Sequence, residues 1–114
     1  MKYQTLRQRA ELLCQELGRL KEEARREGVV LVVEGERDKE ALESLGIEGK
    51  FVVLKCRKGI RQILWELEAK EVIVLTDVDR EGEKLLRVVE EELIHRGIKV
   101  NKLFRAVSYT HLTL

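Results

Sequence analysis

Apolar residues recur along the first quarter of the chain at alternating spacings of four and three. The series runs through Leu6, Ala10, Leu13, Leu17, Leu20 and Ala24. This spacing places them on one face of a helix, and we predict a single helix over residues 5–27 that ends at Gly28. The apolar face either packs on the rest of its own chain or pairs with a second chain, because the same repeat is found in coiled coils.

Four short apolar runs follow, separated by segments with helical periodicity. The runs cover residues 29–33, 51–54, 72–75 and 98–104, and the helical segments cover residues 38–45, 59–68 and 82–96. The first run is typical of a strand that is buried on both faces. Strands that alternate with helices predict a three-layer α/β fold with a mostly parallel, four-stranded sheet and an added N-terminal helix. The last strand is the weakest and is expected at an edge.

The chain divides into three segments by pattern and composition. Residues 1–28 form the helical extension, residues 29–106 form the α/β domain, and residues 107–114 form a tail. The tail contains no Asp, Glu, Lys or Arg, in a chain where these four make up 38% of all residues. We therefore interpret the tail either as a disordered end or as sequence foreign to the natural protein.

Composition limits the partners and the cellular compartment that we expect for the protein. The net charge is +1, so no overall basic field attracts nucleic acid, and contact with DNA or RNA must come from a local patch. Cys14 and Cys56 lie far apart and match no zinc spacing, which favours reduced thiols in a cytoplasmic protein. No apolar run approaches the roughly 20 residues of a membrane span, so no membrane partner is expected. Trp65 is expected in the core.

Three acidic residues come soon after two of the predicted strands. Glu34 follows the strand at 29–33, and Asp77 and Asp79 follow the strand at 72–75. The carboxyl ends of parallel strands meet at one edge of a sheet, where such folds bind ligands. Asp77 and Asp79 would point to the same side of an extended segment, which suits one shared Mg²⁺ or two neighbouring ions. The alternative is a capped turn before the next helix, although one aspartate would be enough for that.

Two glycines and one further acid adjoin these positions. Gly35 would let a backbone or a phosphate approach Glu34 closely. Gly82 would begin a helix whose free backbone N–H groups face an anion. Asp38 is interpreted as the N-cap of the helix at 38–45. Acids that meet without compensation repel one another, which raises carboxyl pKa values and favours a bound cation.

A basic loop at 55–58 follows the second strand and is therefore expected at the same edge as the acids. Lys55, Arg57 and Lys58 in this loop are candidates for contact with a nucleic-acid backbone, and Arg80 beside the two aspartates is another. The other explanation is a solvated helix start. That explanation is weaker than usual, because cations at a helix N-terminus oppose its dipole.

The sequences Val-Val-Glu-Gly-x-x-Asp at 32–38 and Leu-Thr-Asp-x-Asp-x-x-Gly at 75–82 resemble the two signature motifs of the Toprim domain. This domain is shared by type IA and type II topoisomerases, bacterial-type primases, old-family nucleases, recombination-repair proteins and the 5S ribosomal RNA maturase. The resemblance covers residues 29 to about 104 and implies a Rossmann-like Toprim sheet. Gly35 and Gly82 match the motif glycines.

The resemblance also implies roles for the acids. Glu34 matches the family glutamate, proposed as general acid or base in making or breaking a phosphodiester. Asp77 and Asp79 match the Mg²⁺-binding pair, with Glu34 as a third candidate ligand and Mn²⁺ as a substitute ion. Asp38 matches a frequent acid of the first motif and is an accessory candidate.

Features of individual Toprim enzymes are missing from this sequence. Tyr3 and Tyr109 lie near the termini, outside the context of a topoisomerase nucleophile. The predicted function is Mg²⁺-dependent phosphodiester chemistry on DNA or RNA, most simply nicking or trimming by a nuclease-like enzyme, with nucleotidyl transfer as a related reaction. One alternative is a Mg²⁺-binding module that needs a partner for turnover, as part of a homodimer or a larger nucleic-acid-processing assembly. Another is phosphate chemistry on a small molecule.

Overall fold

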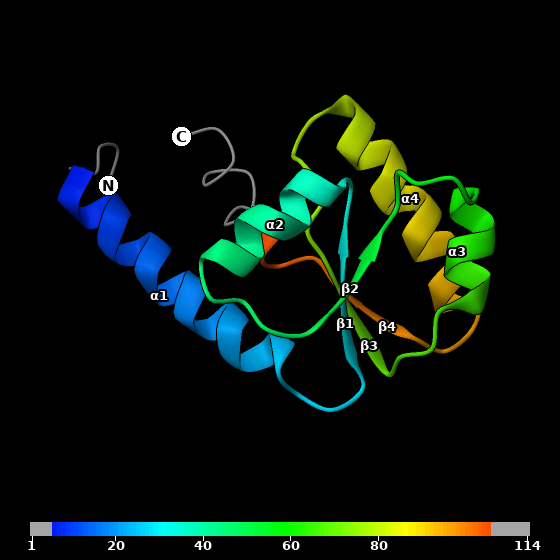
Figure 1. Ribbon diagram of the computed structural model, residues 1–114, viewed down its shortest axis with the longest axis horizontal. Helices are drawn as coiled ribbons and strands as arrows, with labels where there is room; N and C mark the ends of the chain where they lie inside the picture. Colours follow the sequence, from blue (N-terminus) through cyan, green and yellow to red (C-terminus); the bar gives the residue numbers. More distant parts are fainter. Residues whose placement is uncertain (1–5, 106–114) are drawn as a thin grey trace.

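The computed structural model describes residues 6–105, and the predicted tail at 107–114 lies outside them. The elements are α1 (Leu6–Ala24), β1 (Val29–Val33), α2 (Glu36–Ser44), β2 (Lys50–Val53), α3 (Ile60–Glu66), β3 (Glu71–Val74), α4 (Arg80–Ile94) and β4 (Lys99–Asn101). The four strands form one sheet in the order β2-β1-β3-β4, and every neighbouring pair is parallel. The predicted α/β fold, with its added N-terminal helix, is confirmed (Figure 1).

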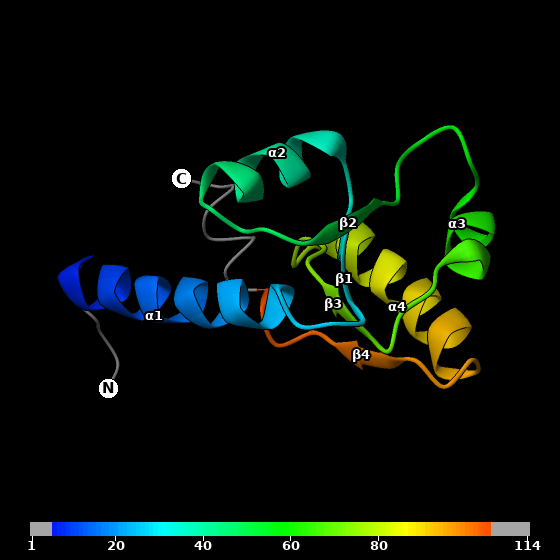
Figure 2. The same ribbon diagram turned by 60° about the horizontal axis from the view of Figure 1, so that its bottom comes forward.

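Two helices cover each face of the sheet, which makes three layers (Figure 2). All five residues of β1 are buried, because successive side chains of a strand point to opposite faces and both faces are covered. Leu31 and Val33 pack in the core beneath α1 and α2. Val30 and Val32 pack in the core beneath α3 and α4. The continuous apolar run at 29–33 is thus explained by burial on two sides.

The helix α1 is anchored at one end only. Leu20 and Ala24 near its C-terminus are buried in the core against the sheet, whereas Leu6 near its N-terminus is 83% exposed. Figures 1 and 2 both show the N-terminal half of α1 extending past the sheet. The apolar stripe therefore packs on its own chain from Leu13 onward, whereas Leu6 and Ala10 are exposed.

Two helices end as the sequence predicts. Gly46 and Gly97 follow α2 and α4 with φ angles of +88° and +74°, a left-handed conformation that glycine adopts without a steric penalty. The next residue in each case, Ile47 or Ile98, is buried. These glycines turn the chain back so that the following strand can enter the sheet.

Two large apolar side chains of the helices lie at the surface, and one of them is Trp65, which the sequence predicts in the core. Trp65 is 73% exposed, and Ile94 near the end of α4 is 58% exposed. In α3, Leu64 takes the inward position and is fully buried, so its neighbour Trp65 is turned away by about 100° of helix rotation. Within residues 6–105, no helix is long and apolar enough to cross a membrane.

Candidate functional site

The central strands β1 and β3 lie side by side, and the direction of chain progression across the sheet reverses between them. In open parallel sheets, ligands bind beyond the carboxyl ends of the strands at such a reversal. Glu34 directly follows β1, and Asp77 comes three residues after the last residue of β3. Figure 1 shows α2 and α4 beginning at this same end of the sheet. The structure therefore brings the acids of both motifs to one place.

Glu34 is a buried carboxylate with few compensating partners. The residue is 6% exposed. Its Oε1 accepts a hydrogen bond from the backbone N–H of Asp77 at 3.1 Å, and Lys55 Nζ lies 3.9 Å from its Oε2. Burial raises the pKa of Glu34, and the carboxylates of Asp77 and Asp79 add to this, whereas the backbone N–H and Lys55 oppose it. Glu34 is thus placed to hold a proton more readily than an exposed glutamate.

Asp77 has a similar electrostatic environment. Burial raises its pKa, followed by repulsion from the carboxylates of Asp38 and Asp79, with Lys55 and Arg105 opposing. Within the described part of the chain, no cation forms an ion pair with the carboxylate of Asp77 or Asp79. The cluster therefore has more negative charge than its neighbours neutralise, a condition that a bound cation would relieve.

Asp79 caps the helix that follows it. Its Oδ1 accepts the N–H of Gly82 at 2.7 Å, and its own backbone is extended, with φ of −137°. The expectation that Gly82 begins this helix and offers a free N–H group to an anion is wrong. The helix begins at Arg80, and the Gly82 N–H is already used. Helix capping thus accounts for one carboxylate oxygen of Asp79 but not for Asp77, whose carboxylate does not cap the helix.

Gly82 is required for a steric reason. A Cβ atom added there would lie 1.8 Å from the backbone oxygen of Asp77 and 3.0 Å from Oε1 of Glu34. The first distance is far below any van der Waals contact, and the atom concerned belongs to the backbone and is held in place. The absence of a side chain at Gly82 thus allows the aspartate loop, the start of α4 and Glu34 to pack together.

The first motif differs in detail from its prediction. Gly35, and not Asp38, is the N-cap of α2, with an ordinary extended φ of −135°. Asp38 lies one turn further along, and its Oδ2 accepts the N–H of Gly35 at 3.0 Å. An added Cβ at Gly35 would meet only this oxygen, at 3.7 Å, which is a normal contact. The space beside Gly35 is therefore open, and no contact among residues 6–105 requires a glycine there.

Lys55 is the cation of the basic loop that reaches the acids. Its Nζ lies 2.8 Å from Oε1 of Glu81 and 3.9 Å from Oε2 of Glu34. The hydrogen bond to Glu81 raises the pKa of Lys55, so the ammonium stays charged. Since Glu81 is exposed, a phosphate could take its place as the partner of Lys55.

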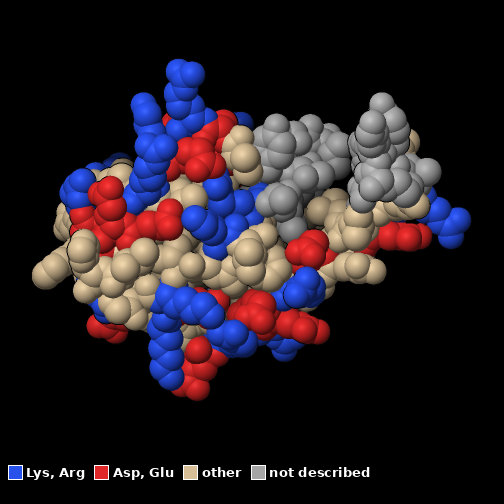
Figure 3. All heavy atoms as spheres, turned by 180° about the vertical axis from the view of Figure 1, so that it is seen from behind, with Lys and Arg blue, Asp and Glu red and all other residues tan. Residues whose placement is uncertain are grey.

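The other three basic candidates face solvent. Lys58 pairs with Glu66 at 2.8 Å, away from the acids. Arg57 and Arg80 are exposed, and neither has an ion pair among residues 6–105. Figure 3, which looks at the face opposite to that of Figure 1, shows basic and acidic side chains interspersed. Arg57 and Arg80 thus remain available for a phosphate, whereas Lys58 is already paired.

Arg105 also contributes to the site, and the sequence analysis did not find it. Its Nη2 donates to the backbone oxygen of Asp77 at 2.7 Å, its Nε donates to that of Thr76 at 3.1 Å, and its Nη1 lies 2.8 Å from Glu83. The side chain is only 11% exposed. Arg105 lies outside both motifs and 28 residues beyond Asp77, so no local pattern indicates its role.

The donor chemistry of the site fits Mg²⁺, although the side chains do not yet surround an ion. No group of three or more His, Cys, Asp or Glu residues among those described is arranged to hold a metal. The acids are carboxylates, two of them without ion pairs, and Mg²⁺ prefers a few carboxylate oxygens together with water and phosphate. Asp77 and Asp79 would hold the ion, with Glu34 beside it.

The fold and the position of the acids place this chain among the parallel α/β domains that carry acidic residues where the strand order reverses. The chain belongs to the Toprim domain family, whose model matches residues 28–104. A UPF0292 protein from Methanocaldococcus jannaschii is 49% identical over 78 residues, which are 66% of this chain and 60% of that protein. A UPF0292 protein from Pyrococcus horikoshii is 37% identical over 71 residues, which are 62% of this chain and 54% of that protein.

A solved structure described as a putative protein from Aquifex aeolicus has the same fold. It superposes with a TM-score of 0.71 at 29% identity and covers 82% of this chain and 85% of its own. The chain spans between 54% and 60% of the length of the two curated relatives. The predicted Toprim resemblance is confirmed, and family membership supports a metal-binding, nucleic-acid-associated role.

Proposed function

We propose that this protein carries out Mg²⁺-dependent phosphodiester chemistry on DNA or RNA, most simply nicking or trimming. The observation that carries the proposal is the position of Glu34. It is a buried carboxylate that accepts a hydrogen bond from the backbone of Asp77, at the strand-order reversal of a Toprim sheet. It lies next to two carboxylates that form no ion pair with any of the described residues. Toprim domains are associated with metal-dependent work on nucleic acids, and this arrangement has the acids which that work requires.

Each residue of the site has a defined task in this proposal. The raised pKa of Glu34, caused first by burial, suits a group that must accept and release a proton at the reacting oxygen. Asp77 and Asp79 would hold Mg²⁺ or Mn²⁺, which when bound offsets charge on the phosphate and on the leaving oxygen. Bound metal would lower the pKa of Glu34, so metal binding and proton transfer are coupled.

The basic residues position the substrate in the same proposal. Arg57 and Arg80 are exposed and have no competing ion pair in the described part of the chain, so they are free to contact phosphates on either side of the reacting one. Lys55 adds a contact close to Glu34 when its bond to Glu81 is exchanged for one to a phosphate. These contacts fix the position of the strand but read no base sequence.

One observation favours the alternative, a module that depends on a partner for turnover. Among the basic candidates, Lys55 pairs with Glu81 and Lys58 pairs with Glu66, so the described part of this chain offers a small phosphate-binding surface. A second copy or a partner subunit would then supply the rest. In that case the site binds metal, but cleavage appears only with the partner.

The test uses labelled single- and double-stranded DNA and RNA, incubated with the protein in Mg²⁺, Mn²⁺ or EDTA. We expect metal-dependent cleavage that is lost in Glu34→Gln and Asp77→Asn. Glu36→Gln is the matched control, because this exposed carboxylate lies two residues from Glu34 and outside the cluster. Cleavage that survives in both site variants would exclude the proposed site. Metal binding without cleavage by the wild type would favour the partner-dependent alternative.

A further inference from the structure

The aspartate loop is held in place through its backbone. Thr76 is fully buried, yet its hydroxyl has no hydrogen-bond partner among the described residues, so its side chain does not anchor the loop. The loop is anchored instead through the peptide groups on either side of Asp77. Its N–H donates to Glu34 at 3.1 Å, and its carbonyl accepts from Arg105 at 2.7 Å.

We infer that Arg105 is a positioning residue that fixes the Asp77 loop for metal binding. This inference rests on the proposed metal site. The guanidinium spans two successive carbonyl oxygens, those of Thr76 and Asp77, and a third contact to Glu83 on α4 sets its orientation. The loop before α4 is thus tied to the chain segment that follows β4.

The strength of this contact follows from its chemistry. Hydrogen bonds from a charged donor are stronger than neutral ones, and the flat guanidinium can reach two acceptors at fixed geometry. The side chain is 11% exposed, so water competes weakly for it. A lysine keeps the charge but has a single ammonium group, which cannot reproduce the planar fork that spans both carbonyls.

The molecule contains a control with the same kind of contact as Arg105, at the more exposed Arg96. Arg96 also donates from its guanidinium to two carbonyl oxygens, those of Leu64 and Leu67 at the end of α3. It follows α4, whereas the acids precede that helix, so it lies at the other end of the sheet. Loss of Arg96 removes the same kind of contact without touching the aspartate loop.

The experiment measures metal affinity of the full chain by titration with Mn²⁺, followed by electron paramagnetic resonance, and with Mg²⁺, followed by calorimetry. All variants are compared at a temperature where circular dichroism shows them folded. Removing the support behind a metal ligand commonly weakens metal binding about 10- to 100-fold. We expect a loss in that range for Arg105→Ala, a smaller loss for Arg105→Lys, and less than a twofold change for Arg96→Ala.

A variant that keeps Arg105 covers the case in which Arg105→Ala does not fold. Glu83→Gln removes the ion pair that orients the guanidinium but leaves both carbonyl contacts possible, and Glu83 is 45% exposed, so this protein should fold. We expect Glu83→Gln to weaken Mn²⁺ binding modestly, by about two- to fivefold, since contacts that hold a metal ligand in position tune metal affinity.

The outcomes separate this inference from the function on which it rests. Wild-type metal binding, together with unchanged affinity in Arg105→Lys and Glu83→Gln, would overturn the positioning role and leave the proposed function standing. Equal losses in Arg105→Ala and Arg96→Ala would also overturn it, since they would reflect general destabilisation. No metal binding by the wild type would overturn the proposed function and this inference with it.

Discussion

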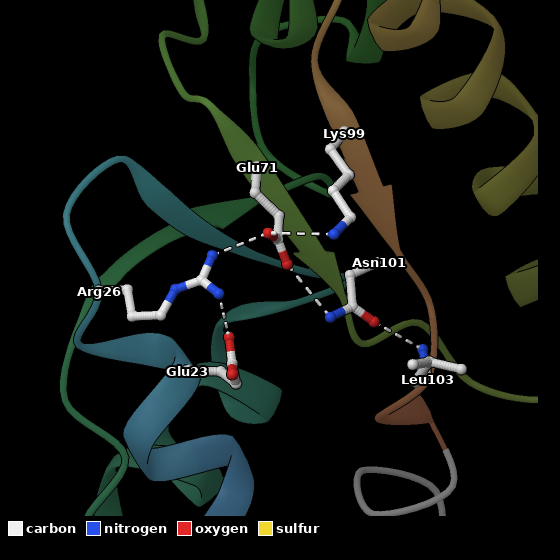
Figure 4. A network of polar contacts seen from close by, with 6 residues as sticks. All are labelled: Glu23, Arg26, Glu71, Lys99, Asn101 and Leu103. Carbon is white, nitrogen blue, oxygen red and sulfur yellow. Dashed lines mark hydrogen bonds and ion pairs between the residues drawn. The ribbon is translucent and has the colours of Figure 1, made fainter.

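Two buried glutamates lie at opposite ends of neighbouring strands, and their surroundings are opposite in character. Glu71, at the start of β3, is 5% exposed and meets positive or neutral donors. Arg26 Nη2 donates to it at 2.9 Å, Asn101 Nδ2 donates at 3.2 Å, and Lys99 Nζ lies 3.9 Å away (Figure 4). Glu34, at the other end of β1, meets one N–H, one distant lysine and other acids.

The network around Glu71 extends further. Arg26 also pairs with Glu23 of α1 at 2.7 Å, and the Oδ1 of Asn101 accepts the N–H of Leu103 at 3.0 Å. Figure 4 shows these residues converging from α1 and the turn after it, from β3, and from β4 and the segment after it. Glu71 thus links three elements at the amino edge of the sheet, and every group in the network has a partner.

The comparison shows that the same residue type can stabilise the fold at one end of a sheet and remain available to a cation or a proton at the other end. A buried carboxylate whose charge is met by cations and an amide holds neighbouring elements together. A buried carboxylate placed among other acids destabilises the metal-free protein, and a cation or a proton relieves that cost. The amino edge therefore holds the fold together, and the carboxyl edge is available for chemistry.

The largest expected effect comes from Gly82→Ala, which disrupts the carboxyl edge and leaves the Glu71 network in place. The new Cβ would lie 1.8 Å from the Asp77 oxygen, so the loop or the helix must move. We expect a loss of about 3 kcal/mol or more in the free energy of unfolding. Urea denaturation measures it, with the exposed helical Gly18→Ala as control.

At Gly18 an added Cβ has no atom within 4 Å, so alanine there should stabilise α1 by roughly 0.5–1 kcal/mol. Equal stability of Gly82→Ala and the wild type would mean that the close packing of loop, helix and Glu34 is wrong.

An intermediate effect is expected from the same substitution at both buried glutamates. Glu71→Gln removes the charge that Arg26 and Lys99 surround and should cost about 1–3 kcal/mol. Glu34→Gln removes one of several repelling charges, and the amide oxygen can still accept the Asp77 N–H, so the metal-free protein should gain up to about 1 kcal/mol. Urea denaturation at pH 8 compares the two. A destabilisation of similar size in both would remove the distinction between the edges.

The smallest expected effect is a change in the pH dependence of stability. Burial raises the pKa values of Glu34 and Asp77 above their ordinary values of 4.5 and 3.8 in the folded protein. Between the ordinary and the raised pKa, the folded state binds more protons than the unfolded state. The contribution of these groups to stability therefore falls as pH rises through that window.

We expect the difference in unfolding free energy between the wild type and Glu34→Gln to change across that window and then level off. Denaturation of metal-free protein at a series of pH values, repeated with excess Mg²⁺, measures it. Mg²⁺ should stabilise the wild type at the high-pH end. A difference that does not vary with pH would contradict the raised pKa of Glu34.

The sequence predicts the acidic edge because that prediction depends on topology alone. A continuous run of apolar residues at 29–33 must be a strand covered on both sides, and the carboxyl ends of parallel strands share an edge. Glu34 and Asp77 therefore come together whatever the details of their side chains. The glycine at 82 was expected near the site, but its steric reason became visible only from the position of the Asp77 oxygen.

Other features depend on coordinates that no local pattern contains. Asp77 and Asp79 are both suitable N-caps, and only the backbone conformation decides that Asp79 takes this role. Arg105 acts on a loop 28 residues away in sequence. In α3, a helix of seven residues, the apolar positions do not decide which face turns inward. The sequence therefore predicts Trp65 in the core, although it lies at the surface.

The strand order also has a consequence for the synthesis of the protein. During synthesis, Glu34 is added 43 residues before Asp77, and Asp77 is added 28 residues before Arg105. The strand β1 can pair with β2 early, but its other edge stays open until β3 has been made. We therefore expect the nascent chain to expose the edge of Val29–Val33, which is prone to aggregation. The acids of the two motifs would meet only after Asp77 has been made, so shorter nascent chains lack the complete acidic site.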